Sequence, residues 1–416
     1  MRRSADAVIL MRQDFENKDI QVLCPGGMIW NEWGQYRPDV PFSDVVIEYL
    51  STLSSSLLRD RESRLYPDVV TFAFFCRKAN LLAQKKKYVR DDNLRLGRGV
   101  LFHIAPSNVP INFGYSLVAG LLSGNYNIVR VSSKIFPQVD LIVRHMLAME
   151  TIGIYKEVSD RIVLVRYDRT SDATNLFSSI CNVRIIWGGD TTIAHIRQSA
   201  IPARSFDVTF ADRYSMAVIR ADRMMQVNDT VIDSLAEEFY NDTYLFDQNA
   251  CSAPHLVVWV GEKEHIERSH ERSWNAVWRL VDQKYEFQSV LAVDKLTAFY
   301  RQAINMPMER EWTKDNKLVL VNMKRLDASI DDHRCAGGYF SEYRAADLKE
   351  IVSIVKDKYQ TLAYYGFDKE ELEGFITDSR LKGIDRIVPF GETTSFSFMW
   401  DGYNLIETLS RECSIF

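Results

Sequence analysis

Hydrophobic residues recur at helical spacing in the first part of the chain. Residues 43–59 follow a Ser43–Asp44 start signal and carry one apolar stripe, made of Val46, Leu50, Leu53 and Leu57. A second helix is predicted from Asp68 to about Lys86, with an inward face of Val69, Phe72, Cys76 and Leu82. The three lysines at its end, Lys85-Lys86-Lys87, could bind phosphate or a partner protein. We favour the simpler interpretation of a solvated helix C-terminus, where the helix dipole stabilises positive charge. We therefore expect a mostly helical N-terminal segment over residues 1–90.

The pattern changes from Gly97 onward, where short apolar and β-branched runs alternate with helical patterns. Strands are predicted at 99–105, 127–131, 161–165 and 183–187, and helices at 111–123, 137–152, 172–180 and 190–199. Strands separated by single helices imply right-handed βαβ units, and hence a parallel sheet with helices on both faces. Such sheets bind ligands beyond the carboxyl ends of their strands.

A second α/β region begins near residue 215. A helix is predicted around 229–246, followed by DQNACSAPH (247–255), a strand at 255–260 and a polar helix from Glu262. Mixed structure continues to about Leu381, and the run 383–413 is rich in aromatic residues. Since no repeat or long linker separates these regions, short crossings must join the domains.

Composition narrows the class of protein. The 416 residues are 46% hydrophobic, 26% charged and 12% aromatic, which is typical of a globular protein of roughly two or three domains. The formal net charge is −5, which disfavours general nucleic-acid binding because that needs a basic face. No apolar run approaches roughly 18 residues, so we expect no membrane span, and the N-terminal sequence lacks the features of a secretory signal.

Cysteine and histidine usage gives two further expectations. The six cysteines lie at wide intervals without a CxxC pair, which indicates reduced thiols in a cytoplasmic protein. The seven histidines include no HExxH motif, so we expect no metal site.

Cys251 is the residue most suggestive of chemistry. It follows a predicted helix, has the small neighbours Ala250 and Ser252, and lies three residues after Gln248. A thiolate nucleophile needs room for a substrate and nearby backbone N–H groups, and small neighbours provide both. Local sequence alone, however, fits a small buried hydrophobic residue better.

Polar residues also follow the first strand of the predicted sheet. In PSNVP (106–110), Pro106 and Pro110 hold Asn108 and its neighbour Ser107 in an extended segment. An amide fixed there can donate to an oxyanion, but an Asx-turn explains Asn108 better when the segment is taken alone.

Two later strand ends carry groups that suit phosphate. Arg130, Ser132, Ser133 and Lys134 form a cationic, hydroxyl-bearing cluster, of a kind that is also common on protein surfaces. Gly188-Gly189 precedes Asp190 as in a phosphate-accepting turn, although a turn with a helix N-cap explains it equally well.

Taken in order, these pieces resemble the aldehyde dehydrogenase superfamily, and within it the LuxC-type acyl-CoA reductases most. The resemblance covers roughly residues 95–416 and is carried by six segments, of which 103–138 and 245–255 are the most specific to this family. The segments are HIAPSNVPINFGYSLVAGLLSGNYNIVRVSSKIFPQ (103–138), IIWGGDTTIAHIR (185–197), FADRYSMAVI (210–219), LFDQNACSAPH (245–255), GIDRIVPFGE (383–392) and WDGYNLIETLSR (400–411).

The resemblance implies an α/β fold of the aldehyde dehydrogenase type. Its parts are a Rossmann-like cofactor domain (91–218), an α/β catalytic domain with the cysteine (219–382), and a C-terminal segment (383–416) that returns to the cofactor domain or an oligomer interface. It also implies that the Cys251 thiolate attacks a fatty acyl thioester and that hydride from a reduced nicotinamide yields the aldehyde. Asn108 and the Cys251 N–H would stabilise the oxyanion, and Gln248 belongs to the same catalytic motif.

The resemblance assigns the cofactor residues as well, namely Pro106, Ser107, Arg130, Ser132, Ser133, Lys134, Gly188 and Gly189. NAD-preferring aldehyde dehydrogenases place a glutamate three residues after a lysine, where it meets the adenosine ribose. The matching pair here is Arg130 and Ser133, so the carboxylate is missing and NADPH is the expected cofactor. If these charges only face solvent, both cofactors should be accepted.

Two segments depart from the superfamily. FADRYSM (210–216) lacks the glutamate that activates water for hydrolysis, which favours exchange of the acyl group with a thiol such as CoA. HRCAGG (333–338) stands where a glutamate would hold the nicotinamide ribose, so no contact is assigned there.

The leading expectation is therefore an NADPH-dependent reductase of fatty acyl-CoA, acting as a homo-oligomer, either dimer or tetramer. In an alternative, the acyl group comes from an acyl-protein synthetase subunit. In another, the chain is a non-catalytic, acyl-binding scaffold of the same fold.

Overall fold

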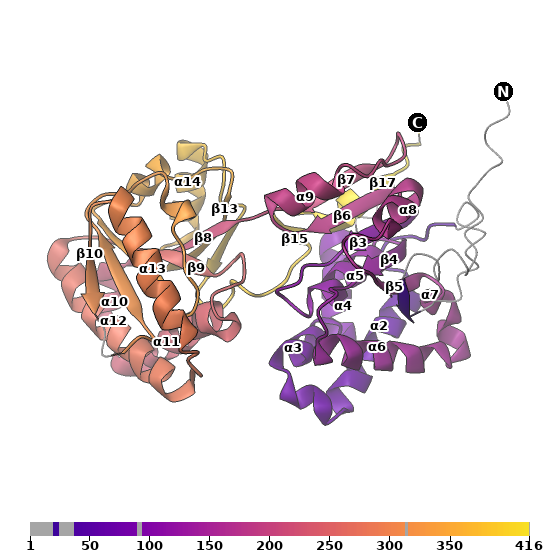
Figure 1. The fold of residues 1–416 in the computed structure, drawn as a ribbon, viewed down its shortest axis with the longest axis horizontal. Coiled ribbons are helices and arrows are strands. Elements are labelled where there is room, and N and C mark those ends of the chain that lie inside the picture. The colour runs from indigo at the N-terminus through magenta and orange to yellow at the C-terminus, as the bar shows by residue number, and fades with distance from the viewer. Residues whose placement is uncertain (1–19, 25–36, 90–93, 313–314, 416) are drawn as a thin grey trace. The chain divides into compact units, whose positions relative to one another are not determined.

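The computed structural model describes residues 20–24, 37–89, 94–312 and 315–415. The start of the chain, where no secretory signal is expected, lies outside the described residues. The chain divides into two compact units, residues 1–211 with 403–416, and residues 212–402. The first unit runs from indigo to magenta in Figure 1 and includes the yellow C-terminus, whereas the second is mainly orange.

A six-stranded sheet forms the centre of the first unit, in the order β1-β5-β4-β3-β6-β7. All neighbours from β5 to β7 are parallel, and β1 is antiparallel to β5. In chain order the parallel strands read 3-2-1-4-5, which is the Rossmann arrangement with its switch point between β3 and β6. The strands are β1 (Gln21–Cys24), β3 (Val100–Ile104), β4 (Tyr126–Arg130), β5 (Ile162–Arg166), β6 (Val183–Trp187) and β7 (Phe206–Phe210).

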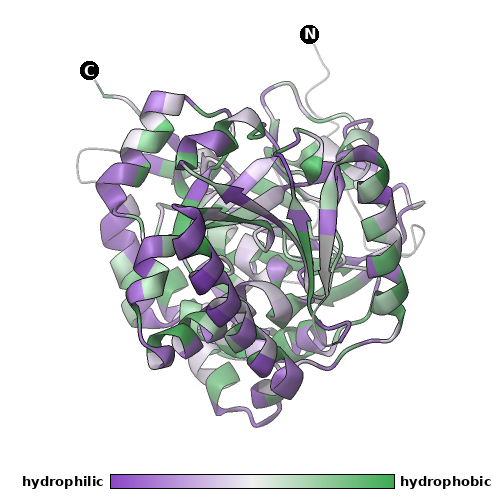
Figure 2. Cartoon of the chain, turned by 90° about the vertical axis from the view of Figure 1, so that its left-hand side faces the viewer, coloured by the Kyte–Doolittle hydropathy of each residue, from purple (hydrophilic) through white to green (hydrophobic). Residues whose placement is uncertain are grey.

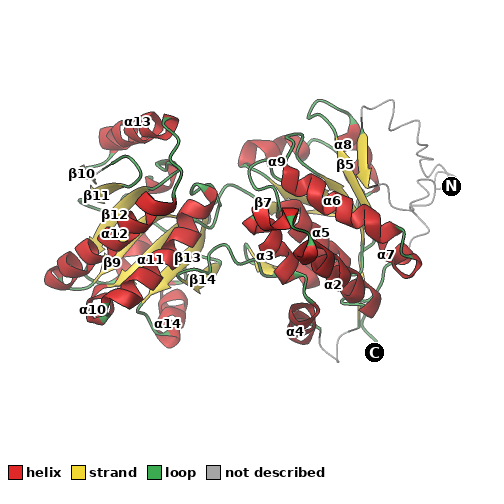
Figure 3. Ribbon diagram, turned by 90° about the horizontal axis from the view of Figure 1, so that it is seen from below, coloured by secondary structure: helices red, strands yellow, loops and turns green. Residues whose placement is uncertain are grey.

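Helices cover both faces of this sheet (Figure 3). One face packs against α8 (Ala173–Ile180) and α9 (Asp190–Ile196) through a cluster that includes Phe102 and Phe177. The other face carries α5 (Asn112–Leu122), with α2 (Asp44–Arg59) and α6 (Pro137–Glu150) beside it. The smaller helical elements are η2 (Glu62–Leu65), α3 (Pro67–Phe75), α4 (Lys78–Tyr88), η3 (Gly153–Tyr155), α7 (Lys156–Ser159) and α15 (Leu405–Leu409). The strands and helices predicted between 99 and 199 are thus confirmed.

The prediction of one continuous helix from Asp68 to Lys86 is wrong in one respect, because the structure has two helices there, α3 and α4. Cys76 and Arg77 separate α3 from α4, and the Asn80 side chain donates to the Phe75 carbonyl at 2.7 Å, which satisfies the end of α3. The interruption changes the direction of the buried face. Leu81 is fully buried, whereas Leu82, predicted to point inward, is 39% exposed.

The second unit contains a seven-stranded sheet in the order β10-β11-β12-β9-β8-β13-β14, parallel throughout except for the β10–β11 pair. The strands are β8 (Tyr214–Arg220), β9 (Pro254–Val260), β10 (Met308–Trp312), β11 (Val319–Met323), β12 (Tyr339–Ala345), β13 (Tyr359–Tyr365) and β14 (Arg386–Pro389). Two sheets, each parallel except for one edge strand, with covering helices confirm the predicted α/β class.

Alternate residues of β8 and β9 point to opposite faces, which produces two cores. Ala217 and Trp259 pack under α10 (Ala221–Gln226), α11 (Asp229–Thr243) and α12 (Lys263–Lys284). Met216 and Val258 face η6 (Leu348–Ser353) and α14 (Lys369–Ser379). Also in this unit are η4 (Tyr244–Phe246), α13 (Val290–Asn305), η5 (Ile330–Asp332) and β15 (Met399–Trp400). Figure 2 shows hydrophilic residues, in purple, along the helices that cover this unit.

The boundaries between the units differ from the expected ones. The first crossing lies at residues 211/212 rather than 218/219, because β8 pairs with β9 and β13 inside the second sheet. The described residues of the expected N-terminal part, 20–24 and 37–89, do not form a separate part, since β1 extends the first sheet and α2 packs on α5 and α6. The segment 383–416 is divided: it stays in the second unit to Gly402, and β16 (Tyr403–Asn404) opens its return to the first. There β17 (Ser410–Glu412) pairs with β2 (Arg95–Gly97).

Candidate active site

A cavity of about 830 Å³ lies at the carboxyl ends of the strands in the first unit. Its walls come from the segments after β3, β4, β5 and β6, so it lies at the switch point of the sheet, where such folds bind ligands. Of the predicted cofactor residues, it brings together Pro106, Ser107, Arg130, Ser132, Ser133, Gly188 and Gly189.

Asn108 lines the same cavity, directly after the β3 strand. Its side chain is exposed, as is that of Ser107, while Ala105 behind them is buried and its N–H donates to the Arg130 carbonyl at 3.0 Å. The segment is therefore anchored at its base with its polar side chains free to meet a ligand.

Arg130 ends β4, and its guanidinium lies 4.8 Å from the centroid of the Tyr167 ring and donates to the Tyr167 carbonyl at 3.2 Å. Burial lowers the pKa of Arg130, and among the described residues its Nε atom has no hydrogen-bond partner. A buried N–H without a partner is costly, so a ligand acceptor at this point would be favourable.

The other members of the phosphate cluster have different surroundings. The Ser132 hydroxyl accepts a hydrogen bond from the Lys134 N–H at 3.1 Å and thereby shapes the turn, whereas the Ser133 side chain is exposed at the cavity wall. The Lys134 ammonium lies 5.0 Å from the Phe136 ring centroid, and Lys134 does not line the cavity. At Gly189 the space beside the backbone is open, which leaves room for a ligand.

Sequence reasoning missed part of this cavity. Arg169, Thr170 and Thr174, beyond the end of β5, and His195 on α9 also line it. The sequence could have indicated these residues, because each comes after a predicted strand of the same sheet, and residues beyond neighbouring strand ends converge on one site.

In the second unit, Cys251 lies in the loop between η4 and β9. Two successive residues of this loop, Asp247 and Gln248, have left-handed backbone, with φ of 51° and 60°, a conformation that non-glycine residues adopt only when their surroundings enforce it. Here the surroundings do so: the Gly337 N–H donates to the Asp247 carbonyl at 3.0 Å, and the Ser215 hydroxyl donates to the Cys251 carbonyl at 2.7 Å.

Gln248 is buried, and its whole amide is used by backbone groups. Its Nε2 donates to the carbonyls of Pro254 (2.9 Å) and Tyr339 (3.1 Å), and its Oε1 accepts from the N–H groups of Gly338 (2.9 Å) and Tyr339 (3.2 Å). The Gln248 side chain therefore joins the cysteine loop to the start of β12, and its catalytic role stays a prediction.

The Cys251 thiol is half-buried and held among polar groups of its own unit. Burial raises the pKa of this thiol to about 11, the charge of Asp401 acts in the same direction, and a hydrogen bond from Gln360 and the charge of Arg213 oppose them. The Gln360 Nε2 lies 3.5 Å from the sulfur. In the structure as it stands, therefore, the protonated thiol is the stable form near neutral pH.

The two segments that depart from the superfamily, 210–216 and 333–338, contact each other through Asp212 of the first and Arg334 of the second. Asp212 is ion-paired with Arg334 and with Lys358, whose Nζ is 3.1 Å from the carboxylate. Burial disfavours its charge, but these two cations outweigh burial and lower the pKa of Asp212. A carboxylate neutralised in this way is a poor base for activating water.

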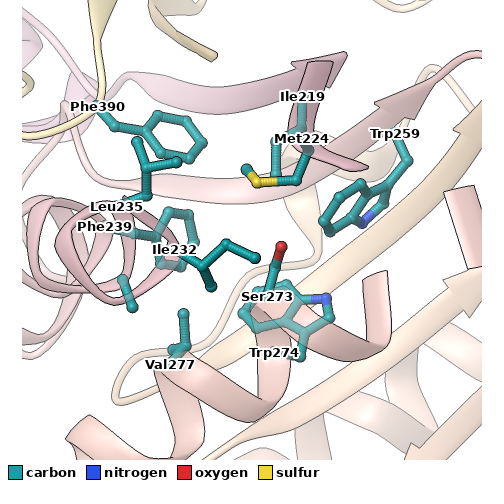
Figure 4. A pocket seen from close by; sticks show the side chains of 11 residues that line it. Ile219, Met224, Ile232, Leu235, Phe239, Trp259, Ser273, Trp274, Val277 and Phe390 are labelled. Carbon is teal, nitrogen blue, oxygen red and sulfur yellow. The ribbon is translucent and has the colours of Figure 1, made fainter. Parts of the chain in front are cut away.

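A second cavity lies in the core of the same unit, between the sheet and helices α10 to α12 (Figure 4). It measures about 30 Å³, and Figure 4 shows Met224, Trp259, Ser273 and Trp274 around it. One water molecule occupies about that volume, so the cavity is too small for an acyl chain.

Three further findings concern the described part of the chain. All six cysteines have free thiols. Within the described ranges, no three histidine, cysteine or acidic residues are grouped so that they could hold a metal ion. Nor do these ranges contain a helix with the length and apolarity needed to cross a membrane.

Comparison with curated proteins gives two relatives, both named long-chain acyl-protein thioester reductase. The one from Vibrio harveyi is 23% identical over 324 residues, which is 76% of this chain and 62% of the relative. The one from Aliivibrio fischeri is 21% identical over 310 residues, 72% of this chain and 60% of the relative. The chain thus spans about three fifths of the length of the curated relatives it matches.

Comparison with solved structures gives aldehyde dehydrogenases. A variant of 1-pyrroline-5-carboxylate dehydrogenase of Thermus thermophilus has a TM-score of 0.60 at 12% identity, covering 92% of this chain and 82% of its own. NAD-dependent benzaldehyde dehydrogenase from Corynebacterium glutamicum has a TM-score of 0.59 at 11% identity, covering 92% and 86%. These similarities confirm the aldehyde dehydrogenase-like fold. Residues 80–412, most of the chain, match the family model described as acyl-CoA reductase (LuxC), so the chain belongs to the LuxC family.

Proposed function

We propose that this protein reduces fatty acyl thioesters to aldehydes through an acyl-cysteine on Cys251. The observation that carries the proposal is the loop that holds this thiol: left-handed backbone, buried anchors and small neighbours place a half-buried sulfur at a fixed position. Structural cysteines need no such construction, whereas a nucleophile does. The family match supports the same chemistry.

In the proposed reaction the Cys251 thiolate attacks the thioester carbonyl, and the tetrahedral oxyanion expels the donor thiol, leaving the acyl group on sulfur. A nicotinamide cofactor, when bound, supplies the hydride that reduces this acyl group. Hydride addition leaves a tetrahedral oxyanion on the acyl carbon; this oxyanion re-forms the carbonyl as the C–S bond breaks, and Cys251 keeps the electron pair as a thiolate while the aldehyde leaves. We assign stabilisation of the oxyanion to Asn108 and the Cys251 N–H.

The cavity of the first unit fits a nicotinamide dinucleotide. Its volume and polar walls suit such a ligand, and the buried Nε–H of Arg130 has no acceptor within the described part of the chain. We propose NADPH rather than NADH, because by the motif resemblance Ser133 replaces the carboxylate that would repel the 2′-phosphate, and Arg130 can donate to that phosphate. Lys134 is left out of this assignment, because it does not line the cavity.

Two acyl donors fit the proposal. Fatty acyl-CoA is favoured by the family description, and an acyl-protein partner by the names of the two curated relatives. Both donors deliver a thioester to the same sulfur. Assays with acyl-CoA alone, and with an acylated synthetase from a related system, would distinguish them.

The test is acylation with radiolabelled tetradecanoyl-CoA, followed by reduction with NADPH. Cys251→Ser should fold normally and lose the label, because an alcohol is a much weaker nucleophile than a thiolate. The controls are Cys335→Ser and Cys413→Ser, which remove the other half-buried thiols and should leave labelling intact. Labelling of Cys251→Ser at another thiol, with turnover preserved, would reject the proposal.

A further inference from the structure

Gln360 lies near the start of β13, fully buried, and its amide nitrogen contacts two groups. It donates to a carboxylate oxygen of Asp401 and lies 3.5 Å from the sulfur of Cys251. Gln360 is 109 positions from Cys251 and 41 positions from Asp401 along the chain, so the fold of this unit brings the three residues together. On the other side of the amide, the Thr361 hydroxyl donates to the Gln360 Oε1 at 3.3 Å.

The orientation of the Gln360 amide follows from its partners. Burial raises the pKa of Asp401, and the charge of Arg213 opposes this. In its ionised form this carboxylate can only accept hydrogen bonds, so the NH₂ group of Gln360 faces it. The second hydrogen of the same nitrogen is then available to Cys251. If the amide were reversed, its oxygen would meet the carboxylate of Asp401 and the electron-rich sulfur, which is repulsive.

We propose that Gln360, oriented by Asp401, is the hydrogen-bond donor that stabilises the thiolate of Cys251. This inference rests on the proposed function, in which that thiolate is both the attacking and the leaving group. Once the sulfur is acylated it becomes a poor acceptor, so the bond is stronger before attack and again when the C–S bond breaks. Gln360 would thus stabilise the Cys251 thiolate both before it attacks the thioester and when it is released with the aldehyde.

Several charges surround the pair. Asp401 disfavours the thiolate and Arg213 favours it, and the Arg213 Nε lies 3.6 Å from the Asp401 carboxylate. Arg213 is also paired with Asp385. Arg386, whose guanidinium lies 4.4 Å from the centroid of the Trp400 ring, interacts electrostatically with both Cys251 and Asp401.

These surroundings make two substitutions act in opposite directions. Gln360→Met keeps the volume of the side chain and removes the donor, so it should raise the pKa of the Cys251 thiol. Asp401→Asn keeps an acceptor for Gln360 and removes the negative charge, so it should lower that pKa. The matched control is Asp385→Asn, which removes the other carboxylate on Arg213 and should leave the thiol pKa nearly unchanged.

The experiment measures the rate at which iodoacetamide alkylates Cys251 in the full chain as a function of pH, with the Cys251 peptide quantified by mass spectrometry. We expect Gln360→Met to shift the inflection upward by about one unit, a roughly tenfold loss of thiolate at a given pH. Asp401→Asn should shift it downward. The acylation rate at neutral pH should fall in Gln360→Met.

An unchanged inflection in Gln360→Met would overturn the inference, as would an equal downward shift in Asp385→Asn and Asp401→Asn. Where Gln360→Met folds poorly, Gln360→Leu removes the same donor and provides the test. Failure of the proposed function is distinguishable, because the thiol would then titrate as expected while the acyl label appeared elsewhere or nowhere.

Discussion

Replacing Gln248 tests whether this residue holds the cysteine loop or takes part in the chemistry. Its side chain makes four hydrogen bonds to buried backbone groups, and Gln248→Ala removes all of them. At roughly 1 kcal/mol for each hydrogen bond, the free energy of unfolding should fall by about 4 kcal/mol. That loss is large compared with the effect of most single substitutions.

Gln248→Glu gives a sharper version of the test, because the new side chain has the same shape. One oxygen can still accept from Gly338 and Tyr339, but the other meets the carbonyls of Pro254 and Tyr339, which repel a negative charge. The pKa of the new carboxyl is therefore raised in the folded state above the unfolded value of about 4.3. The variant should be closest to the original protein below that pH and lose stability as pH rises through the raised value.

The assay is urea unfolding of the full chain followed by circular dichroism, at a series of pH values, for both variants and the original protein. A stability loss below about 1 kcal/mol in Gln248→Ala, or a deficit in Gln248→Glu that does not change with pH, would refute the reasoning. A fully folded Gln248→Ala that cannot be acylated would instead give Gln248 a catalytic role.

Three further predictions concern other residues. Asn108→Ala should slow turnover by about 100- to 1,000-fold in single-turnover kinetics; a loss confined to NADPH affinity would make it a turn residue. Ser133→Glu should move cofactor preference away from NADPH by at least about tenfold in kcat/KM, since the carboxylate repels the 2′-phosphate; equal use of NADH by the original protein would contradict this. Ser273→Ala should raise the free energy of unfolding by about 1 kcal/mol, because the buried hydroxyl makes no hydrogen bond with described residues; a loss in urea unfolding would oppose it.

The local pattern of the sequence determined most of the secondary structure and the fold class. The strands around 100–104 and 183–187 and the helices between them follow from β-branched runs and helical spacing, which depend on neighbours a few residues away. The cavity residues Asn108, Arg130 and Gly189 were found for the same reason, since each lies at or shortly beyond a strand end of one parallel sheet.

Tertiary structure decided the features that depend on residues distant in the chain. The exposure of Leu82 follows from an interruption at Cys76 that a continuing apolar pattern conceals. Motif position made Gln248 a catalytic candidate, but its partners on β12 lie about ninety residues further on. Gln360 and Asp401 meet at the Cys251 sulfur because β13 and a later loop fold beside it. No local spacing encodes such contacts, because they arise only when the sheet assembles and its buried polar groups must find partners.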